Sequence, residues 1–94
     1  MTIKEYLTEN QEKLDLYTTA ITRAHGKNHP ETFDVRDLYT ELEPAILNED
    51  SETVTTIFGK LREVTSNYEI PNDVCETFEA TYKMLGEMDQ LQVN

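Results

Sequence analysis

The sequence predicts an all-α protein, an antiparallel up-down-up-down bundle of four helices in one domain, residues 1–94. Apolar residues recur every three or four positions in four segments, about 3–25, 30–47, 51–68 and 72–90, which gives each segment one apolar face as a helix. Short connections separate the segments, so consecutive helices are expected to lie side by side and to run in opposite directions.

The first helix has a recognisable start and stop. Thr2 and Glu5 have the spacing of a capping box, in which each side chain bonds a free backbone N–H of the first turn. Gly26 is suited to end the helix in the left-handed conformation. The apolar stripe between them comprises Ile3, Leu7, Leu14, Tyr17, Ile21 and Ala24.

Start signals for the second helix follow directly. Asn28 can cap it, Pro30 suits its first turn, and Glu31 has the return position of a capping box. Pro44 lies within the apolar stripe, and we expect a kink or an early end there because proline lacks the N–H donor and clashes with the preceding turn. The stripe comprises Val35, Leu38, Tyr39, Leu42 and Ile46.

The third helix has the most regular apolar period, and the fourth is marked by a clear break before it. Pro71 cannot continue the third helix, and Asn72 is the expected cap of the fourth. Residues 90–94 are expected to fray. The period of the third helix runs through Val54, Ile57, Phe58, Leu61, Val64 and Tyr68.

The negative charge of the chain limits the classes of partner that it is expected to bind. Eight Lys and Arg stand against nineteen Asp and Glu, a net charge of −11. Nucleic acids and anionic membrane surfaces are bound through Lys and Arg, so we expect neither as a partner. Cys75 is the only cysteine, which excludes an internal disulfide, and the N-terminus lacks the features of a signal peptide. These observations predict a cytoplasmic protein.

Signatures of catalysis are missing. The sequence has no Gly-rich phosphate loop, no Cys-x-x-Cys pair, no HExxH and no GxSxG, so an enzyme is the less favoured interpretation. A Cys75 nucleophile would need a histidine base, and the topology places both histidines at the same end of the bundle as Cys75. The alternative is a small buried thiol beside the apolar stripe.

The candidate site is the corner at residues 25–30, His-Gly-Lys-Asn-His-Pro. His25 falls at the edge of the inward stripe, and Glu31 on the inward side of the next helix. Because metal sites in bundles combine inward imidazoles with inward carboxylates, His25, Glu31 and His29 are the candidate metal ligands. The alternative is capping, in which His25 bonds the last carbonyls of its helix, Glu31 caps the next, and His29 is an exposed corner residue.

The number of histidines limits a metal site in one chain. Di-iron centres in bundles draw histidines and carboxylates from all four helices, and this chain has two histidines on one corner. A two-fold homodimer that joined two corners would double the histidines and supply two copies of Glu31.

Two stretches carry a family resemblance. One is ITRAHGKNHPE, residues 21–31, and the other joins LREVTSNY, residues 61–68, to IPNDVCETF, residues 70–78. They resemble the corner motif and the third-to-fourth helix crossing of the hemerythrin-like proteins that repair iron centres, the RIC family. The resemblance implies a hemerythrin-like bundle with a non-haem di-iron centre. It also implies a cytoplasmic role in restoring iron–sulfur clusters after nitric oxide or oxidative damage.

Residue by residue, the resemblance implies a short relative with few of the family's ligands. His25 matches a histidine that binds iron in the family. The second helix of the family carries His-x-x-x-Glu where this chain has DLYTE at residues 37–41. The third opens with Glu-His-Asp where this chain has DSE at residues 50–52, and the terminal His-x-x-x-Glu of the fourth has no counterpart.

Two functional hypotheses follow. The first is a RIC-like helical protein of iron–sulfur cluster repair and nitrosative or oxidative stress, with iron–sulfur proteins as partners, which binds iron weakly, in a dimer, or not at all. The second is a metal-free acidic helical module that pairs with itself or with a basic partner.

Overall fold

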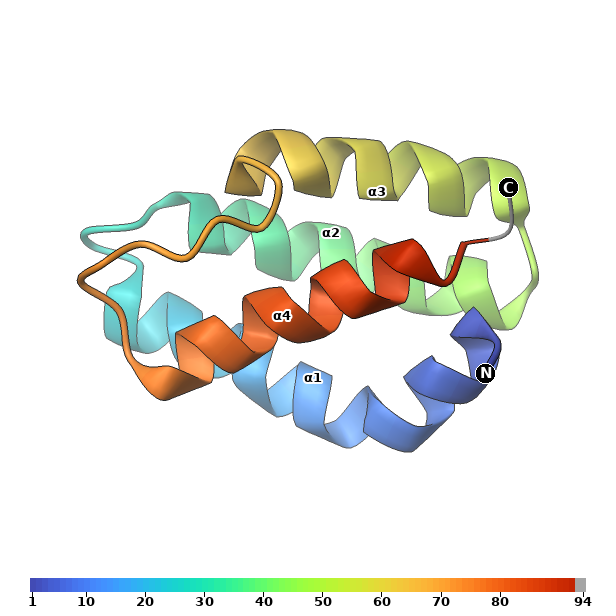
Figure 1. Ribbon diagram of the computed structural model, residues 1–94, viewed down its shortest axis with the longest axis horizontal. Coiled ribbons are helices and arrows are strands. Elements are labelled where there is room, and N and C mark those ends of the chain that lie inside the picture. The colour runs from blue at the N-terminus through green and yellow to red at the C-terminus, as the bar shows by residue number, and fades with distance from the viewer. Residues whose placement is uncertain (93–94) are drawn as a thin grey trace.

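The computed structural model describes residues 1–92 and contains four α-helices, with no strand among those residues. The helices are α1 (Ile3–His25), α2 (Glu31–Leu47), α3 (Ser51–Thr65) and α4 (Glu76–Gln90) (Figure 1). The prediction of an all-helical, four-helix protein is confirmed. None of these helices combines the length and the apolar character needed to cross a membrane.

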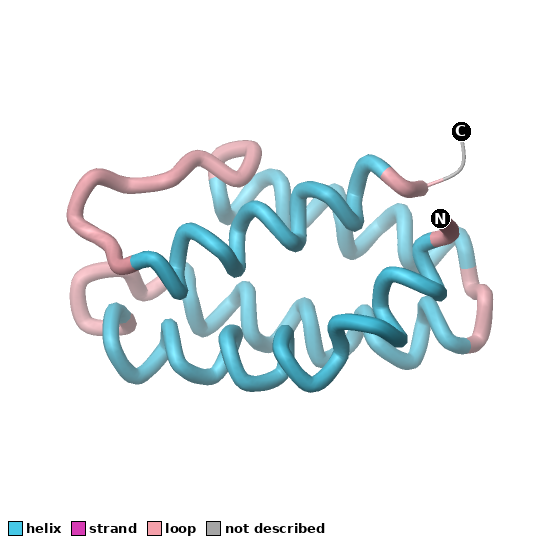
Figure 2. The backbone as a smooth tube through the Cα atoms, turned by 60° about the horizontal axis from the view of Figure 1, so that its bottom comes forward, coloured by secondary structure: helices cyan, strands magenta, loops and turns pink. Residues whose placement is uncertain are grey.

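The helices pack in a defined order around the core. The closest backbone approaches are those of α1 with α2, α2 with α3, and α1 with α4. The corner between α1 and α2 and the α3–α4 connection (residues 66–75) lie at one end of the molecule, as Figures 1 and 2 both show. The N-terminus and the end of α4 lie at the other end. The first of these ends therefore gathers the candidate site residues.

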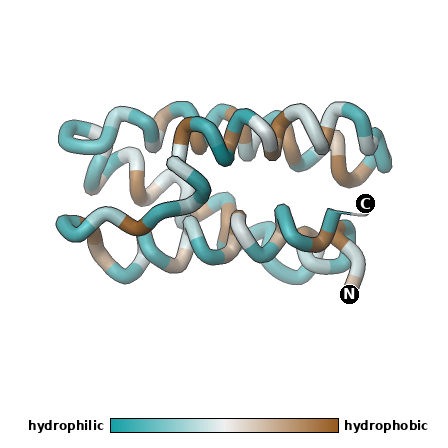
Figure 3. Tube along the Cα trace, turned by 45° about the horizontal axis from the view of Figure 1, so that its top comes forward, coloured by the Kyte–Doolittle hydropathy of each residue, from teal (hydrophilic) through white to brown (hydrophobic). Residues whose placement is uncertain are grey.

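The core is built from the apolar faces of all four helices. Hydrophobic positions recur along each helix between hydrophilic ones (Figure 3). Its largest fully buried side chains are aromatic: Tyr39, Phe58, Phe78 and Tyr82. Burying aromatic rings of this size supplies much of the hydrophobic free energy of a small domain.

The start of α1 is as the sequence indicates, and its end differs. Thr2 and Glu5 form the complete capping box. Gly26 has φ −57°, an ordinary right-handed conformation and not the left-handed one expected. Glycine is required there for space, because a Cβ atom would lie 2.7 Å from the ring of Phe33 and would also collide with the carbonyl of Thr22.

The start and interior of α2 also differ from expectation. Pro30 occupies the position before the first helical residue, and no side chain, Asn28 included, caps the helix there. The helix passes through Pro44 and continues to Leu47. Pro44 is exposed and lies in the last turn, where a missing donor and a tilted backbone disturb little of the helix.

The junction of α3 and α4 is longer than the sequence suggests. α3 ends at Thr65 and not at residue 68, because Ser66, Asn67 and Tyr68 all have positive φ. α4 begins at Glu76, with Cys75 and not Asn72 in the capping position. Part of the tail expected to fray, residues 93 and 94, lies outside the described residues.

Candidate functional site

Five ionisable or nucleophilic side chains meet at the end of the molecule that holds the α1–α2 corner. His25 ends α1, His29 lies in the corner, and Glu31 begins α2. Asp73 and Cys75 reach them from the α3–α4 connection. The corner itself is a tight turn, in which the backbone N–H of His29 donates to the carbonyl of His25 at 2.7 Å.

His29 is held between two carboxylates. Its Nδ1 lies 3.0 Å from Glu31 Oε2, and its Nε2 lies 2.8 Å from Asp73 Oδ1. The bond to Asp73, and then the bond to Glu31, raise the pKa of His29, and the same contact lowers the pKa of Asp73. Because carboxylates only accept, both ring nitrogens of His29 are donors, which is the protonated form.

His25 contacts the beginning of α4. Its Nε2 lies 3.2 Å from Cys75 Sγ and accepts from the backbone N–H of Cys75 at 3.4 Å. Because the Nε2 that accepts from this N–H carries no proton, the thiol of Cys75 is the donor in the first contact. Cys75 is exposed, in contrast to the buried thiol that was one expectation for it.

The buried ring of Phe78 packs against both imidazoles. Its centroid is 5.3 Å from that of His25 and 5.6 Å from that of His29, both edge-on. Aromatic pairs favour this geometry, so Phe78 fixes the orientation of both histidines from the core side.

The structure brings His25, His29 and Glu31 together, but their hydrogen-bond partners differ from those that the sequence suggests. Glu31 was expected beside His25, and its carboxylate bonds His29 instead. His29 is a candidate ligand in the sequence, with an exposed corner residue as the alternative, and its side chain is only 15% exposed. Asp73 was not recognised as a site residue. Its spacing in the sequence gives no signal, because only the path of the α3–α4 connection brings it to His29.

The donors do not converge on a point where iron could bind. Among residues 1–92, no three His, Cys, Asp or Glu side chains are placed to hold a metal ion. Both nitrogens of His29 are engaged by carboxylates, and Nε2 of His25 is engaged by Cys75. The residues of one chain therefore do not fit the di-iron centre that the resemblance implies.

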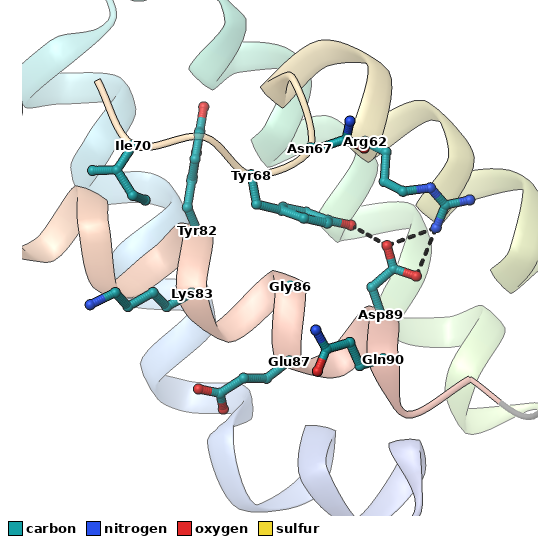
Figure 4. A pocket seen from close by; sticks show the side chains of 10 residues that line it. All are labelled: Arg62, Asn67, Tyr68, Ile70, Tyr82, Lys83, Gly86, Glu87, Asp89 and Gln90. Carbon is teal, nitrogen blue, oxygen red and sulfur yellow. Dashed lines mark hydrogen bonds and ion pairs between the residues drawn. The ribbon is translucent and has the colours of Figure 1, made fainter. Parts of the chain in front are cut away.

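An ion-pair network fixes the α3–α4 connection that carries Asp73 and Cys75. Arg62 of α3 bonds both oxygens of Asp89 at 2.8 and 2.7 Å, and the hydroxyl of Tyr68 donates to the same carboxylate at 2.8 Å (Figure 4). Burial, and then the bond to Asp89, raise the pKa of Tyr68, which stays a neutral donor. These residues border a groove of about 650 Å³ between the connection and α4.

Tyr82 is the one described residue with a buried side-chain polar atom that lacks a partner. The residue is 1% exposed, and its hydroxyl makes no hydrogen bond. An unpaired buried polar group of this kind costs roughly 1–3 kcal/mol. Burial, and then the charge of Glu31, raise the pKa of Tyr82, so the hydroxyl stays protonated.

These features define an all-helical protein with an ionisable cluster at one end of its helices. No family model and no solved structure matches the chain. It is similar to the iron-sulfur cluster repair protein ScdA of Staphylococcus haemolyticus, with 23% identity over 119 residues. The match covers 92% of this chain and 54% of that protein, so the chain spans about half the length of the relative.

Proposed function

We propose that this protein belongs to the RIC-related proteins and takes part in the repair of iron–sulfur clusters after nitrosative or oxidative damage, in the cytoplasm. The observation that carries the proposal is the distant similarity to an iron-sulfur cluster repair protein, which extends over 92% of this chain. In this proposal the four helices form a hemerythrin-like antiparallel bundle. The tight α1–α2 corner, with its HGKNHPE sequence, supports that arrangement.

The proposal includes a specific condition for iron. One chain lacks a convergent ligand set, so iron is held where two copies bring their corners together. Each copy then contributes His25, His29 and Glu31, after Glu31 and Asp73 release His29. Iron–sulfur proteins are the proposed partners, because damaged clusters are the substrate of the repair.

Iron content measured together with mass tests this condition. The chain, purified without a His-tag and loaded anaerobically with ferrous iron, is passed through size-exclusion chromatography with light scattering. We expect iron to elute with the dimer and the His25→Ala variant to lose it. Lys27→Ala, which alters an exposed residue of the same corner, is the control and should keep it. Absence of iron at every oligomeric state would remove metal from the proposal.

The repair role is tested separately. A nitric-oxide-damaged iron–sulfur protein is incubated with the chain, a thiol reductant and ferrous iron, and recovery of the cluster absorbance is followed. We expect recovery to be faster than with an equal amount of an unrelated acidic helical protein. Equal rates would contradict the repair role, whatever the iron content of the chain.

One observation favours the second candidate, a metal-free interaction module. His25 and His29 already have partners within the chain, in Cys75, Glu31 and Asp73. If the module is the function, His25→Ala leaves the oligomeric state and partner binding unchanged. The same variant therefore separates the two candidates.

A further inference from the structure

A recess beneath the α3–α4 connection shares Glu31 with the histidine corner. It has a volume of about 270 Å³, and its wall comes from four parts of the chain, namely α2, the end of α3, the α3–α4 connection and α4. Glu31 lies at the start of α2, Ser66 and Glu69 lie in the connection, and Tyr82 belongs to α4. One water occupies about 30 Å³ in the liquid, so the recess has room for a short chain of atoms.

The hydroxyl of Tyr82 indicates that the recess is built to receive a polar group. It is buried and unpaired, and Tyr82 forms part of the recess wall. Figure 4 shows this hydroxyl pointing toward the connection, whereas the hydroxyl of Tyr68 points to Asp89. Buried polar groups in native proteins nearly always have a partner, so a group in the recess that bonds Tyr82 would remove a cost of the fold.

The wall of the recess carries negative charge. Two carboxylates line it, those of Glu31 and Glu69, and no Lys or Arg does. Glu31 bonds His29 through Oε2, which leaves Oε1 for an occupant. Val64 and Pro71 add an apolar section to the same wall. An occupant that matches this lining has a positive head with several hydrogen-bond donors and a short apolar stem.

We propose that the recess binds a primary alkylammonium group, with the ammonium between Glu31, Glu69 and the hydroxyl of Tyr82. An ammonium carries three N–H donors and a lysine or diamine stem is apolar, which matches the three acceptors and the apolar section. A metal ion matches less well, because a third carboxylate, histidine or cysteine is missing from the wall. The proposal does not rest on iron or on the repair role.

Chemical-shift titration of the ¹⁵N-labelled full chain, in EDTA and without iron, tests it. The probes are butylammonium, its neutral counterpart 1-butanol, Nα-acetyl-lysine methylamide and 1,4-diaminobutane. We expect the ammonium probes to shift the resonances of Ser66, Glu69 and Tyr82, and butanol to leave them in place. If Nα-acetyl-lysine methylamide binds more tightly than 1,4-diaminobutane, the natural ammonium group belongs to a lysine side chain. If 1,4-diaminobutane binds more tightly, the natural ligand is a free diamine.

Two variants with matched controls locate the binding. Glu69→Gln should weaken the binding of the lysine probe about tenfold, which is the loss expected for one hydrogen bond to a charged group. Glu41→Gln, which removes the same charge from an exposed position of α2, should change it little. Tyr82→Phe removes an unpaired hydroxyl and keeps the ring, so it should fold normally and bind more weakly. Tyr17→Phe on α1 should bind as the unaltered chain does.

Four results would overturn the proposal. The first is that no ammonium probe shifts the resonances, and the second is that butanol shifts them equally. The third is that Glu69→Gln and Tyr82→Phe bind the lysine probe as the unaltered chain does. The fourth, measured with EDTA omitted, is that magnesium displaces the probe at a concentration below that of the probe itself. The last result would make the recess a site for a hard metal ion. None of the four bears on the repair assay, so failure here leaves the repair role standing.

Discussion

Among single residues, His29 is a side chain whose charge stabilises the fold. Its ring nitrogens bond Asp73 and Glu31, and these bonds raise its pKa above the usual 6.5. The folded chain therefore holds the proton more tightly than the unfolded chain does. The resulting stability is fully present below about pH 6.5 and is lost as the pH rises through the raised pKa.

Replacing Asp73 with asparagine tests the origin of this shift. Asp73→Asn removes its largest cause, so the pKa of His29 should fall toward 6.5. The variant should be less stable than the unaltered chain near pH 6, and the difference should shrink as the pH rises through the raised pKa and His29 loses its proton in both. Nuclear magnetic resonance titration of the imidazole measures the pKa, and thermal unfolding at each pH measures the stability.

Asp37→Asn serves as the control for that prediction. It removes the same charge from an exposed position on α2, so it should leave the pKa of His29 almost unchanged. Equal shifts of the His29 pKa in the two variants would mean that the overall charge, and not the hydrogen bond to Asp73, sets it.

Gly26 gives a second prediction for a single residue. A Cβ atom would lie 2.7 Å from the Phe33 ring, so Gly26→Ala should destabilise the chain by roughly 1–3 kcal/mol. Gly59 lies within α3, where the nearest atom to an added Cβ is 3.9 Å away. Gly59→Ala should therefore stabilise the chain, by roughly 0.5–1 kcal/mol. Urea unfolding compares the two, and changes of the same sign would refute the steric account of Gly26.

Among the structural elements, the α3–α4 connection is held by side-chain bonds to Asp89 of α4. Ser66, Asn67 and Tyr68 are non-glycine residues with φ of 54°, 60° and 63°. A left-handed conformation is unfavourable for such residues, most of all for a bulky one. Bonds from Tyr68 and Arg62 to Asp89 of α4 offset this cost.

Tyr68→Phe tests that explanation. The variant loses the 2.8 Å hydrogen bond to the Asp89 carboxylate, which should cost roughly 1.5–3 kcal/mol. Hydrogen exchange should become faster in residues 66–75 and stay unchanged in α2. Because this connection carries Asp73, the pKa of His29 should also fall slightly. Tyr17→Phe, on the half-buried face of α1, should produce neither effect.

The same connection shows what helical periodicity can and cannot predict. The apolar period and the capping box at Thr2 and Glu5 are local, and they predict the existence and order of the helices and the start of α1. Tyr68 fits the apolar period of α3, which is why the sequence extends that helix to residue 68. Its bond to Asp89, far along the chain, outweighs that preference, and no local pattern reports such a bond.

The candidate site could also be predicted only in part from the sequence. The corner sequence indicates that His25, His29 and Glu31 lie together, because all three come from one short turn. Which side chain bonds which imidazole depends on Asp73 and Cys75, which belong to the α3–α4 connection. The order of the helices predicts that Cys75 lies at the same end as the histidines, but the individual pairings are set by the path of the α3–α4 connection.

For the whole molecule, the net charge of −11 sets a large electrostatic cost of folding. The chain has a radius of gyration of 12.4 Å. At about 0.01 M salt the screening length is about 30 Å, so charges on opposite sides of the molecule repel one another. Near 0.15 M it is about 8 Å, and only close neighbours still interact.

Added salt should therefore stabilise this protein. Salt also weakens favourable ion pairs, but the exposed pair of Lys83 contributes at most about 1 kcal/mol. The pair of Arg62 with the largely buried Asp89 is screened less. Because nineteen acids stand against eight bases, repulsion outweighs these attractions, and the melting temperature should rise between about 0.01 M and 0.15 M sodium chloride. Calorimetry at constant pH measures the change, with sodium and potassium chloride compared to exclude specific ion binding. A fall in melting temperature would show that the ion pairs, and not the excess of acids, dominate the electrostatics of the fold.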